Sequence, residues 1–230
     1  KGQAQETEKP MNIIFILADD LGWNDVTLYG NRTLYETPNI ERLSHRGLTF
    51  TRAYAASPLC SPTRASILTG QTPARTGITT PACHLEAEHT KAFLSKSANP
   101  GSKTIGCNSA TRLDTQLPTL GKLIKAKGYT TAHFGKWHLG LAQEHWPEQH
   151  GFEVAFHAEP SPGPRSYFSP YGINTAGVPS PKNHVGTITD GPEGEYITDR
   201  LTNEALAFIE NHQDEPFFLN FWHYAVHGPW

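Results

Sequence analysis

The amino-acid sequence predicts an α/β fold in which helices sandwich a mostly parallel central sheet. Short apolar runs with the length of buried strands recur along the chain. They alternate with segments whose apolar residues return every three or four positions, as in amphipathic helices. Glycine follows several of these periodic segments, as expected at helix ends. The alternation is typical of parallel sheets, because two parallel strands need a long crossover connection, which is most often a helix.

The first predicted elements lie in the N-terminal third of the chain. Residues 11–18 (MNIIFILA) are continuously apolar, which predicts a strand buried on both faces of the sheet. The sequence also predicts a helix at 38–46 and a short strand at 50–56. The segment LCSPTRASILTG follows, with Pro62 in the first turn of a helix that continues to Gly70.

The later elements repeat the same order of helix and strand. Residues 117–128 form an amphipathic pattern with a glycine stop, and 129–134 are the strand after it. Residues 196–212 have apolar side chains at four-residue steps and predict a helix, which the apolar strand 217–224 follows. Two loop-rich regions interrupt this order, at residues 71–116 and 145–192.

Composition narrows the classes of function. The 230 residues include 19 Lys and Arg against 22 Asp and Glu, a formal net charge of -3, which argues against nucleic acid as a partner. No run approaches the ~20 apolar residues that cross a bilayer, so we expect no membrane span. Residues 1–10 are polar and predict a disordered tail. They lack an apolar signal core, so any export signal has been removed or never existed.

Two adjacent carboxylates follow the first predicted strand. Ligands of open α/β sheets bind at the carboxyl ends of the strands, where Asp19 and Asp20 lie. Neighbouring carboxylates repel each other, so either one is protonated or a cation lies between them. The competing interpretation is that one Asp caps the following turn, and the dipeptide alone favours that interpretation slightly.

A cysteine lies at the start of the helix that contains Pro62. The positive end of the helix dipole stabilises an anion at Cys60, and Arg64 projects from the same face four residues later. A lone cysteine is more often a small buried apolar residue. The combination of Cys, Pro and Arg at a helix start shifts the balance toward a functional site.

Three further candidates follow strands. Lys136 and His138 are two residues apart, so in an extended segment they point to one side and Trp137 to the other. By themselves they would more often be a solvated pair around a core tryptophan. His227 lies in a turn before Gly-Pro at the ligand edge of the sheet. We interpret two other histidines, His133 and His223, as packing residues within strands.

Four segments together resemble the type I, formylglycine-dependent sulfatases of the alkaline phosphatase superfamily. They are NIIFILADDLGWNDVTLYG, TPNIERLSHRGLTFTRAYAASPLCSPTRASILTG, YTTAHFGKWHLG and ITDRLTNEALAFIENHQDEPFFLNFWHYAVHGPW. CSPTR is similar to the family signature, in which an enzyme oxidises the cysteine to formylglycine. The resemblance implies a sulfatase or alkaline-phosphatase-like α/β fold. It also implies that 11–230 are the N-terminal part of the catalytic domain, because the family has a second acidic pair, a lysine and a smaller C-terminal subdomain further on.

The resemblance also implies how the nucleophile is built. Asp19 and Asp20 would be ligands of a divalent cation, usually Ca²⁺ in this family, with Mg²⁺ as the alternative. Cys60, converted to formylglycine and hydrated to a gem-diol, would supply the nucleophilic oxygen and contact the metal. Arg64 would orient that diol.

The remaining implied roles concern the substrate. Lys136 and His138 would line the sulfate pocket, and His138 would assist release of sulfate. His227 would bind sulfate and protonate the departing alcohol. Conversion of Cys60 would leave Cys83 and Cys107 as a possible disulfide inside the first loop-rich region.

These roles predict a periplasmic or secreted sulfatase that a formylglycine-generating or sulfatase-maturing enzyme activates. Its partner would be a sulfated small molecule or glycan. A carbohydrate substrate rests on aromatic residues of the loops that can stack on sugars or pack among themselves, which are Trp146, Tyr167, Phe168 and Tyr171. The alternatives are a phosphonate or phosphate ester hydrolase of the same superfamily, and a non-catalytic fragment that binds sulfated ligands.

Overall fold

The computed structural model describes residues 10–30, 34–156, 163–164, 166–171 and 187–228. The predicted tail therefore lies outside the described residues except for Pro10. The main sheet has four strands in the order β1-β6-β4-β5, and all the pairings are parallel. Its strands are β1 (Ile13–Leu17), β4 (Thr130–Gly135), β5 (Val154–Phe156) and β6 (Phe217–Trp222). The predicted mostly parallel α/β sheet is confirmed.

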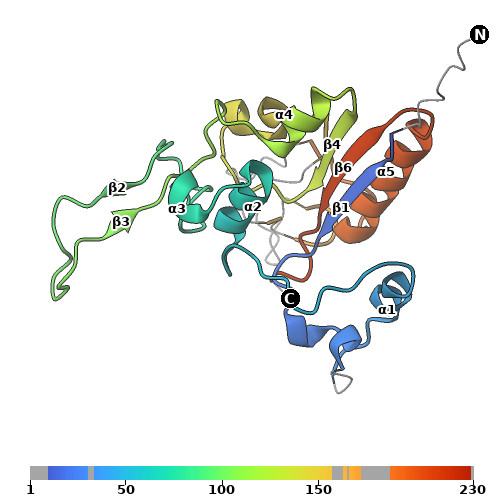
Figure 1. The fold of residues 1–230 in the computed structure, drawn as a ribbon, viewed down its shortest axis with the longest axis horizontal. Helices are drawn as coiled ribbons and strands as arrows, with labels where there is room; N and C mark the ends of the chain where they lie inside the picture. Colours follow the sequence, from blue (N-terminus) through green and yellow to red (C-terminus); the bar gives the residue numbers. More distant parts are fainter. Residues whose placement is uncertain (1–9, 31–33, 157–162, 165, 172–186, 229–230) are drawn as a thin grey trace, which may run out of the picture.

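Five α-helices, one small hairpin and four 3-10 turns complete the described fold (Figure 1). The helices are α1 (Pro38–Ser44), α2 (Cys60–Thr69), α3 (Pro73–Thr76), α4 (Leu120–Lys125) and α5 (Ile197–Asn211). The hairpin pairs β2 (Phe93–Leu94) with β3 (Cys107–Asn108). The 3-10 turns are η1 (Trp23–Asp25), η2 (Thr27–Tyr29), η3 (Gln143–His145) and η4 (Pro147–His150).

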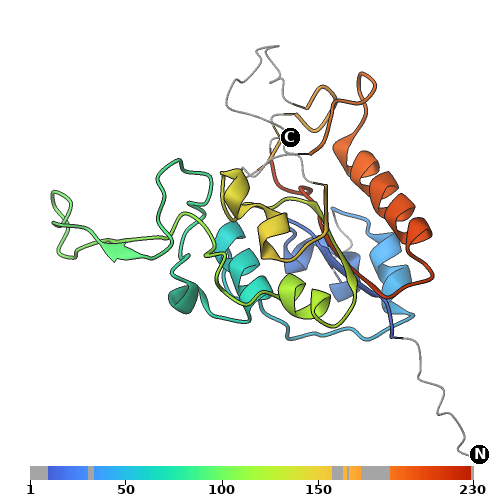
Figure 2. The same cartoon turned by 90° about the horizontal axis from the view of Figure 1, so that it is seen from above.

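Helices cover the two faces of the sheet, with α5 on one side and α2 and α4 on the other (Figure 2). The period of two along β6 explains this division. Phe217, Leu219 and Phe221 pack in the core cluster that includes α5, whereas Phe218 and Trp222 pack in the cluster that includes α2. Each core thus receives alternate residues of the same central strand.

His133 confirms one sequence interpretation. It is fully buried in β4, its Nδ1 lies 2.9 Å from Asn220 Nδ2 of β6, and it contacts the ring of Trp137. His133 is therefore a packing residue. His223 follows β6 instead of lying within it, and it contacts the ring of Phe221.

Two strand predictions need correction. β1 is an edge strand of the described sheet, and its Ile14 and Ile16 are 47% and 56% exposed, so the prediction of burial on both faces is wrong. Phe15 and Leu17 pack against the α2 side, whereas α5 lies over β4 and β6 and leaves the opposite face of β1 open. Residues 50–56 form no strand, because their exposed backbone has no neighbouring strand to pair with in the described structure.

Candidate active site

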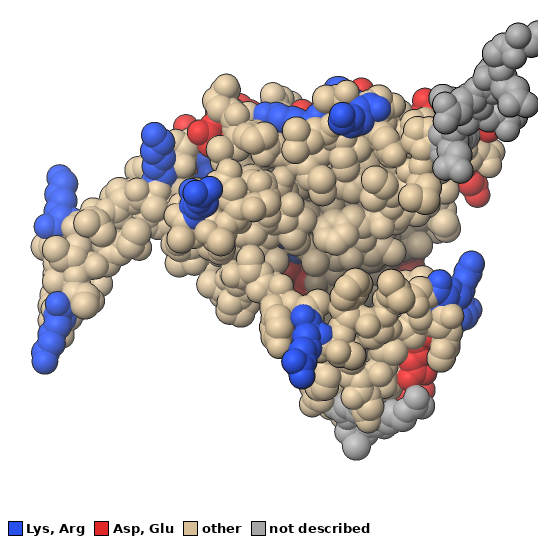
Figure 3. Space-filling model, in the orientation of Figure 1, with Lys and Arg blue, Asp and Glu red and all other residues tan. Residues whose placement is uncertain are grey.

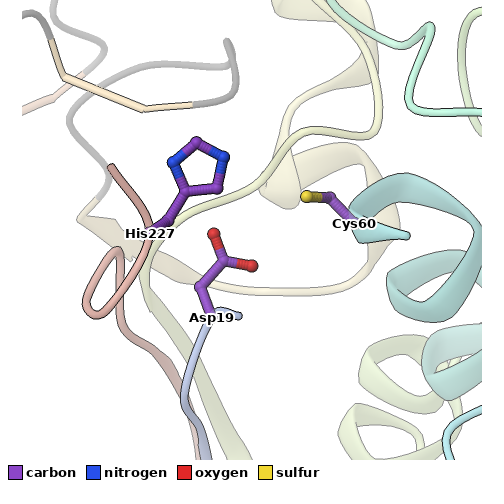
Figure 4. A group of neighbouring side chains, drawn as sticks. All are labelled: Asp19, Cys60 and His227. Atoms are coloured by element: carbon purple, nitrogen blue, oxygen red, sulfur yellow. The ribbon is translucent and has the colours of Figure 1, made fainter. Parts of the chain in front are cut away.

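The carboxyl ends of the parallel strands and the start of α2 bring three side chains together (Figure 4). Asp19 follows β1, Cys60 opens α2, and His227 lies in the segment after β6. One ligand atom from each of them lies within 4.8 Å of the other two. Because parallel strands end at one edge of a sheet, residues separated by more than 200 positions meet there.

The segment after β6 is fastened directly to Asp19. The Asp19 amide donates to the Ala225 carbonyl at 3.0 Å, and the Val226 amide donates to the Asp19 carbonyl at 2.7 Å. Tyr167 adds a side-chain support, because its hydroxyl lies 2.6 Å from the His227 carbonyl. Burial, and secondarily the nearby Asp19 carboxylate, raise the pKa of Tyr167, so the phenol stays a neutral donor. Tyr167 therefore positions the loop of His227.

Asp19 is the buried anionic centre of the site. Arg64 Nη2 donates to Asp19 Oδ1 at 2.9 Å, and the Lys136 ammonium contacts Asp19 Oδ2. Arg64 Nη1 also donates to the Lys136 carbonyl at 2.9 Å, and its guanidinium lies 4.9 Å from the centre of the Trp222 ring. Two cations thus compensate one buried carboxylate, which would otherwise be costly to desolvate.

Lys136 is fully buried, so the interpretation of a solvated loop lysine is wrong. Its Nζ lies 3.5 Å from Cys60 Sγ. Gly135 makes this placement possible: with φ of 101°, it lies so close to β6 that a Cβ there would be 1.8 Å from the Trp222 carbonyl oxygen. The Lys136 amide then donates to that same carbonyl at 2.8 Å, which turns the side chain toward Cys60.

His138 is buried, and it has a partner that sequence reasoning missed. His138 Nε2 lies 3.2 Å from Nδ1 of His84, which comes from the first loop-rich region. Burial is the main cause that lowers the pKa of His138 to about 2, and the positive charge of Lys136 adds to it, so the ring is neutral. The Ser61 hydroxyl donates to the His138 carbonyl at 2.8 Å and ties this residue to α2.

Asp20 lies at the rim of the site. Its side chain is 52% exposed, and its backbone has a positive φ of 58°. Asp20 Oδ2 is 3.7 Å from His227 Nε2. His227 Nδ1 lies 2.5 Å from the Gly228 carbonyl, and since a carbonyl oxygen only accepts, Nδ1 carries the proton. His227 Nε2 is therefore the nitrogen that faces the site.

A cavity of about 290 Å³ opens between the end of β1 and the start of α2. Its walls are residues 17–21 and residues of the segment 55–64, including Asp19, Cys60 and Arg64. Its volume is at the small end of ligand pockets. A small anionic group would meet both the thiol position and the positive end of α2 there.

The donor set suits a hard divalent cation in part. Carboxylate oxygens are the ligands that Ca²⁺ and Mg²⁺ prefer, and Asp19 and Asp20 place two carboxylates at one cavity wall. Calcium takes about six to eight oxygens, so these residues supply a part of a complete shell. Asp20 lies outside the close cluster of Asp19, Cys60 and His227.

The two remaining cysteines do not pair. Both are free thiols: Cys83 is buried, and Cys107 is exposed on β3. Burial raises the pKa of the Cys83 thiol to about 12, so it is an unreactive core residue. The possible disulfide between them is absent because the chain carries Cys107 outward on the hairpin while Cys83 stays in the core.

The aromatic residues proposed for sugar stacking also differ from one another. Tyr171 is completely buried in the α5 core cluster, so of the two alternatives it packs in the protein and offers no face to a sugar. The Trp146 indole donates to the Leu141 carbonyl at 3.0 Å and braces its own loop. Phe168 is 55% exposed and faces the ring of Tyr196 at 5.2 Å. Of the four, Phe168 keeps the most open aromatic face.

A cysteine that opens a helix, with buried cations and an acidic strand end on a parallel α/β sheet, is the arrangement that the sulfatase signature predicts. The family model described as Sulfatase matches residues 11–230, and the chain belongs to this family. N-acetylgalactosamine-6-sulfatase of Sus scrofa is 34% identical over 96% of this chain and 40% of its own length. Human steryl-sulfatase is 41% identical over 63% of this chain and 23% of its own length.

The fold comparison agrees with the family. The crystal structure of Ps i-CgsB in complex with k-i-k-neocarrahexaose matches with a TM-score of 0.72 and 29% identity. The match covers 96% of this chain and 46% of that one. The chain thus spans less than half the length of each of these three proteins. Within the described ranges, every helix is too short or too polar to cross a bilayer.

Proposed function

We propose that this chain is the part of a sulfatase that carries the nucleophile, and that the whole protein hydrolyses sulfate esters of carbohydrates. The observation that carries the proposal is the position of Cys60, at the first turn of α2, 3.5 Å from Lys136 Nζ and clustered with Asp19 and His227. In this proposal a maturation enzyme oxidises Cys60 to formylglycine. The protein then acts in the periplasm or outside the cell.

The chemistry of a sulfate ester explains why these residue types gather. Its sulfur is shielded by negatively charged oxygens, so catalysis needs cations aimed at those oxygens and a strong, fixed nucleophile. Hydrated formylglycine supplies two hydroxyls on one carbon: one attacks sulfur, and deprotonation of the other releases sulfate without a second attack on sulfur. A serine at the same position has a single hydroxyl.

Four further residues of this chain have separate roles in the proposed reaction. Lys136 holds the position of residue 60 and places positive charge beside the entering sulfate. Arg64 holds Asp19 in place. His138 is a neutral hydrogen-bonding ring at the sulfate pocket and assists release of sulfate in this proposal. His227 presents Nε2 to the site and, once that nitrogen is protonated, can give its proton to the departing alcohol.

A divalent cation, Ca²⁺ or Mg²⁺, would be held by Asp19 and Asp20 together with oxygen ligands from elsewhere in the protein. When bound, it supplies positive charge next to the nucleophile and the sulfate oxygens. Asp19 suits this role because its buried carboxylate is already fixed in orientation by Arg64.

Support for a carbohydrate substrate comes from the relatives. The N-acetylgalactosamine-6-sulfatase match extends over nearly all of this chain, whereas the steryl-sulfatase match covers less than two thirds of it. The Ps i-CgsB structure, which also matches 96% of this chain, is a complex with neocarrahexaose. The wider coverage of the two sugar-related matches favours a sulfated sugar over a sulfated sterol.

Peptide mass spectrometry of the native protein tests the nucleophile. Conversion of Cys60 to formylglycine lowers the peptide mass by about 18 Da, because oxygen replaces sulfur and two hydrogens are lost as the CH2–SH group becomes an aldehyde. An unaltered thiol in fully active protein would refute the proposed nucleophile. An unaltered thiol in protein that binds sulfated sugars without turnover would favour the non-catalytic alternative.

Side-by-side turnover of an aryl sulfate and an aryl phosphonate ester tests the substrate class. We expect faster hydrolysis of the sulfate. Preference for the phosphonate would assign the protein to the alternative class of hydrolase in the same superfamily.

A further inference from the structure

A long arm projects from the body of the molecule beyond α3 (Figure 1). It consists of residues 89–111, which contain the β2–β3 hairpin. Its base is closed by the Thr111 amide, which donates to the His89 carbonyl at 2.8 Å, and further out the Ser95 amide donates to the Gly106 carbonyl at 2.9 Å. A two-stranded hairpin is marginally stable alone, so a projecting arm of this kind indicates a function outside the core.

The arm is the basic part of an acidic chain. It contains Lys91, Lys96 and Lys103 and no Asp or Glu, so its formal charge is +3, while the whole chain carries -3. All three lysines are exposed, and on the face shown the outer arm carries basic and no acidic side chains (Figure 3). Glu88, just before the arm, is paired with Arg112 at 2.8 Å, which neutralises the nearest acidic side chain at its root.

Apolar side chains lie between these charges. Phe93, Leu94 and Ile105 are 45%, 68% and 53% exposed. The His89 ring packs edge-on against Phe93 with centroids 4.7 Å apart. A cavity of about 420 Å³ lies over residues 88–93, where Lys91 and Phe93 face the same opening. Exposed rings beside ammonium groups suit a ligand that has both apolar faces and negative charges, as sulfated sugars do.

The arm is anchored in the core that supports α2. Cys83, before the arm, and Ala110, near its end, are fully buried in the core cluster that also contains Ala65 and Leu68 of α2. His84, also before the arm, contacts His138. The arm is therefore fixed to the same core as α2, which carries Cys60 in its first turn.

We propose that the arm is a secondary binding surface for a sulfated polysaccharide, which it holds through its three lysines while one sulfated unit occupies the active site. The identity of the ligand as a sulfated polysaccharide rests on the proposed function. The positive charge of the arm favours a polyanion over a neutral glycan. Binding of this kind weakens with salt, because exposed charges are screened. It raises the local concentration of polymer without changing the chemistry at Cys60.

The test compares two charge-matched variants of the full-length protein. K91Q/K96Q/K103Q removes the arm lysines, and the control R42Q/R46Q/K127Q removes three exposed cations from α1, the segment after it and the segment after α4. Binding to carrageenan and to chondroitin sulfate is measured by affinity electrophoresis at several salt concentrations. Unsulfated chondroitin and duplex DNA serve as comparison ligands.

We expect the arm variant to bind the sulfated polymers roughly tenfold more weakly at low salt, as three lost surface charge contacts allow, while the control stays near wild type. Hydrolysis should show an increased KM for the polymer and an unchanged kcat for a small aryl sulfate. Equal weakening in both variants, unchanged binding of the arm variant, or equally tight binding of duplex DNA by the wild type would each overturn the proposal. Binding is read without turnover, so a failed sulfatase assignment leaves this test decisive.

Discussion

The double contact of Arg64 leads to a quantitative prediction for Arg64→Lys. The substitution keeps the positive charge beside Asp19 but removes the second arm of the guanidinium, which donates to the Lys136 carbonyl at 2.9 Å. A buried carbonyl left without its donor costs about 1–3 kcal/mol. Loss of the flat guanidinium from the Trp222 face adds about 0.5–2 kcal/mol. We expect the free energy of unfolding to fall by roughly 1.5–5 kcal/mol.

Arg64→Met separates charge from geometry in the same experiment. Methionine fills much of the volume but leaves Asp19 with one cation in place of two, and removal of one partner from a buried pair costs about 3–5 kcal/mol. The order of stability should be wild type, then Lys, then Met. Urea unfolding of the full-length protein, followed by tryptophan fluorescence, measures all three.

The matched control is Arg42→Lys on the exposed side of α1, which should change stability by less than about 0.5 kcal/mol. An Arg64→Lys protein as stable as this control would show that the second hydrogen bond of the guanidinium contributes nothing to stability, and it would refute the reasoning. Equal losses for Lys and Met would assign the effect to packing against Trp222 and not to the Asp19 charge.

Three further predictions follow from single residues. His84→Phe should lower kcat on an aryl sulfate several-fold with little change in KM, because His138 loses its 3.2 Å partner, and unchanged kinetics would remove His84 from the site. Cys60→Ser should leave the enzyme sulfated and stalled after one turnover, as intact mass would show, and normal steady-state rates would contradict the two-hydroxyl chemistry. Burial lowers the pKa of His150 to about 3. As pH falls below about 6.5, the histidine is therefore protonated in the unfolded chain while it stays neutral in the folded protein. The free energy of unfolding should be unaffected by this group above pH 6.5 and should drop by about 1.4 kcal/mol per pH unit from there down to pH 3. His150→Phe should reduce this fall in the free energy of unfolding, as urea unfolding at pH 7, 6 and 5 measures it. An unchanged fall would assign the acid sensitivity to other groups.

The central strands β4 and β6 were predictable because each is an apolar run with a clear sequence signal at its boundary. The run 217–224 contains β6, and the glycine stop before 129–134 marks the start of β4. The exposure of β1 was not predictable, because an apolar run looks the same at the centre of a sheet and at its edge. Residues 50–56 mislead for the same reason: strand propensity has no effect without a partner strand.

Some residues of the candidate site were predictable from the sequence and others were not. Asp19 and Cys60 were visible in the sequence because each lies next to a strongly patterned element. His84 was not, since its contact with His138 depends on the path of an irregular loop between them. The same loop misled the prediction for Cys107, which lies on a hairpin that carries it away from Cys83. Proximity through a loop has no period in the sequence, so only the structure shows it.

Net charge and local charge act at different distances in this molecule. A chain of formal charge -3 is a poor general binder of polyanions, yet two buried cations, Arg64 and Lys136, meet the positive end of α2 at one point. Within a few ångströms, where water is largely excluded, these groups dominate an entering sulfate. Beyond about 8–10 Å, salt screens exposed charges and the arm lysines must act by direct contact. In the proposed function, the buried cations fix the reacting sulfate and the arm holds the neighbouring units, so selectivity for one sulfate within a sulfated polymer would require both elements.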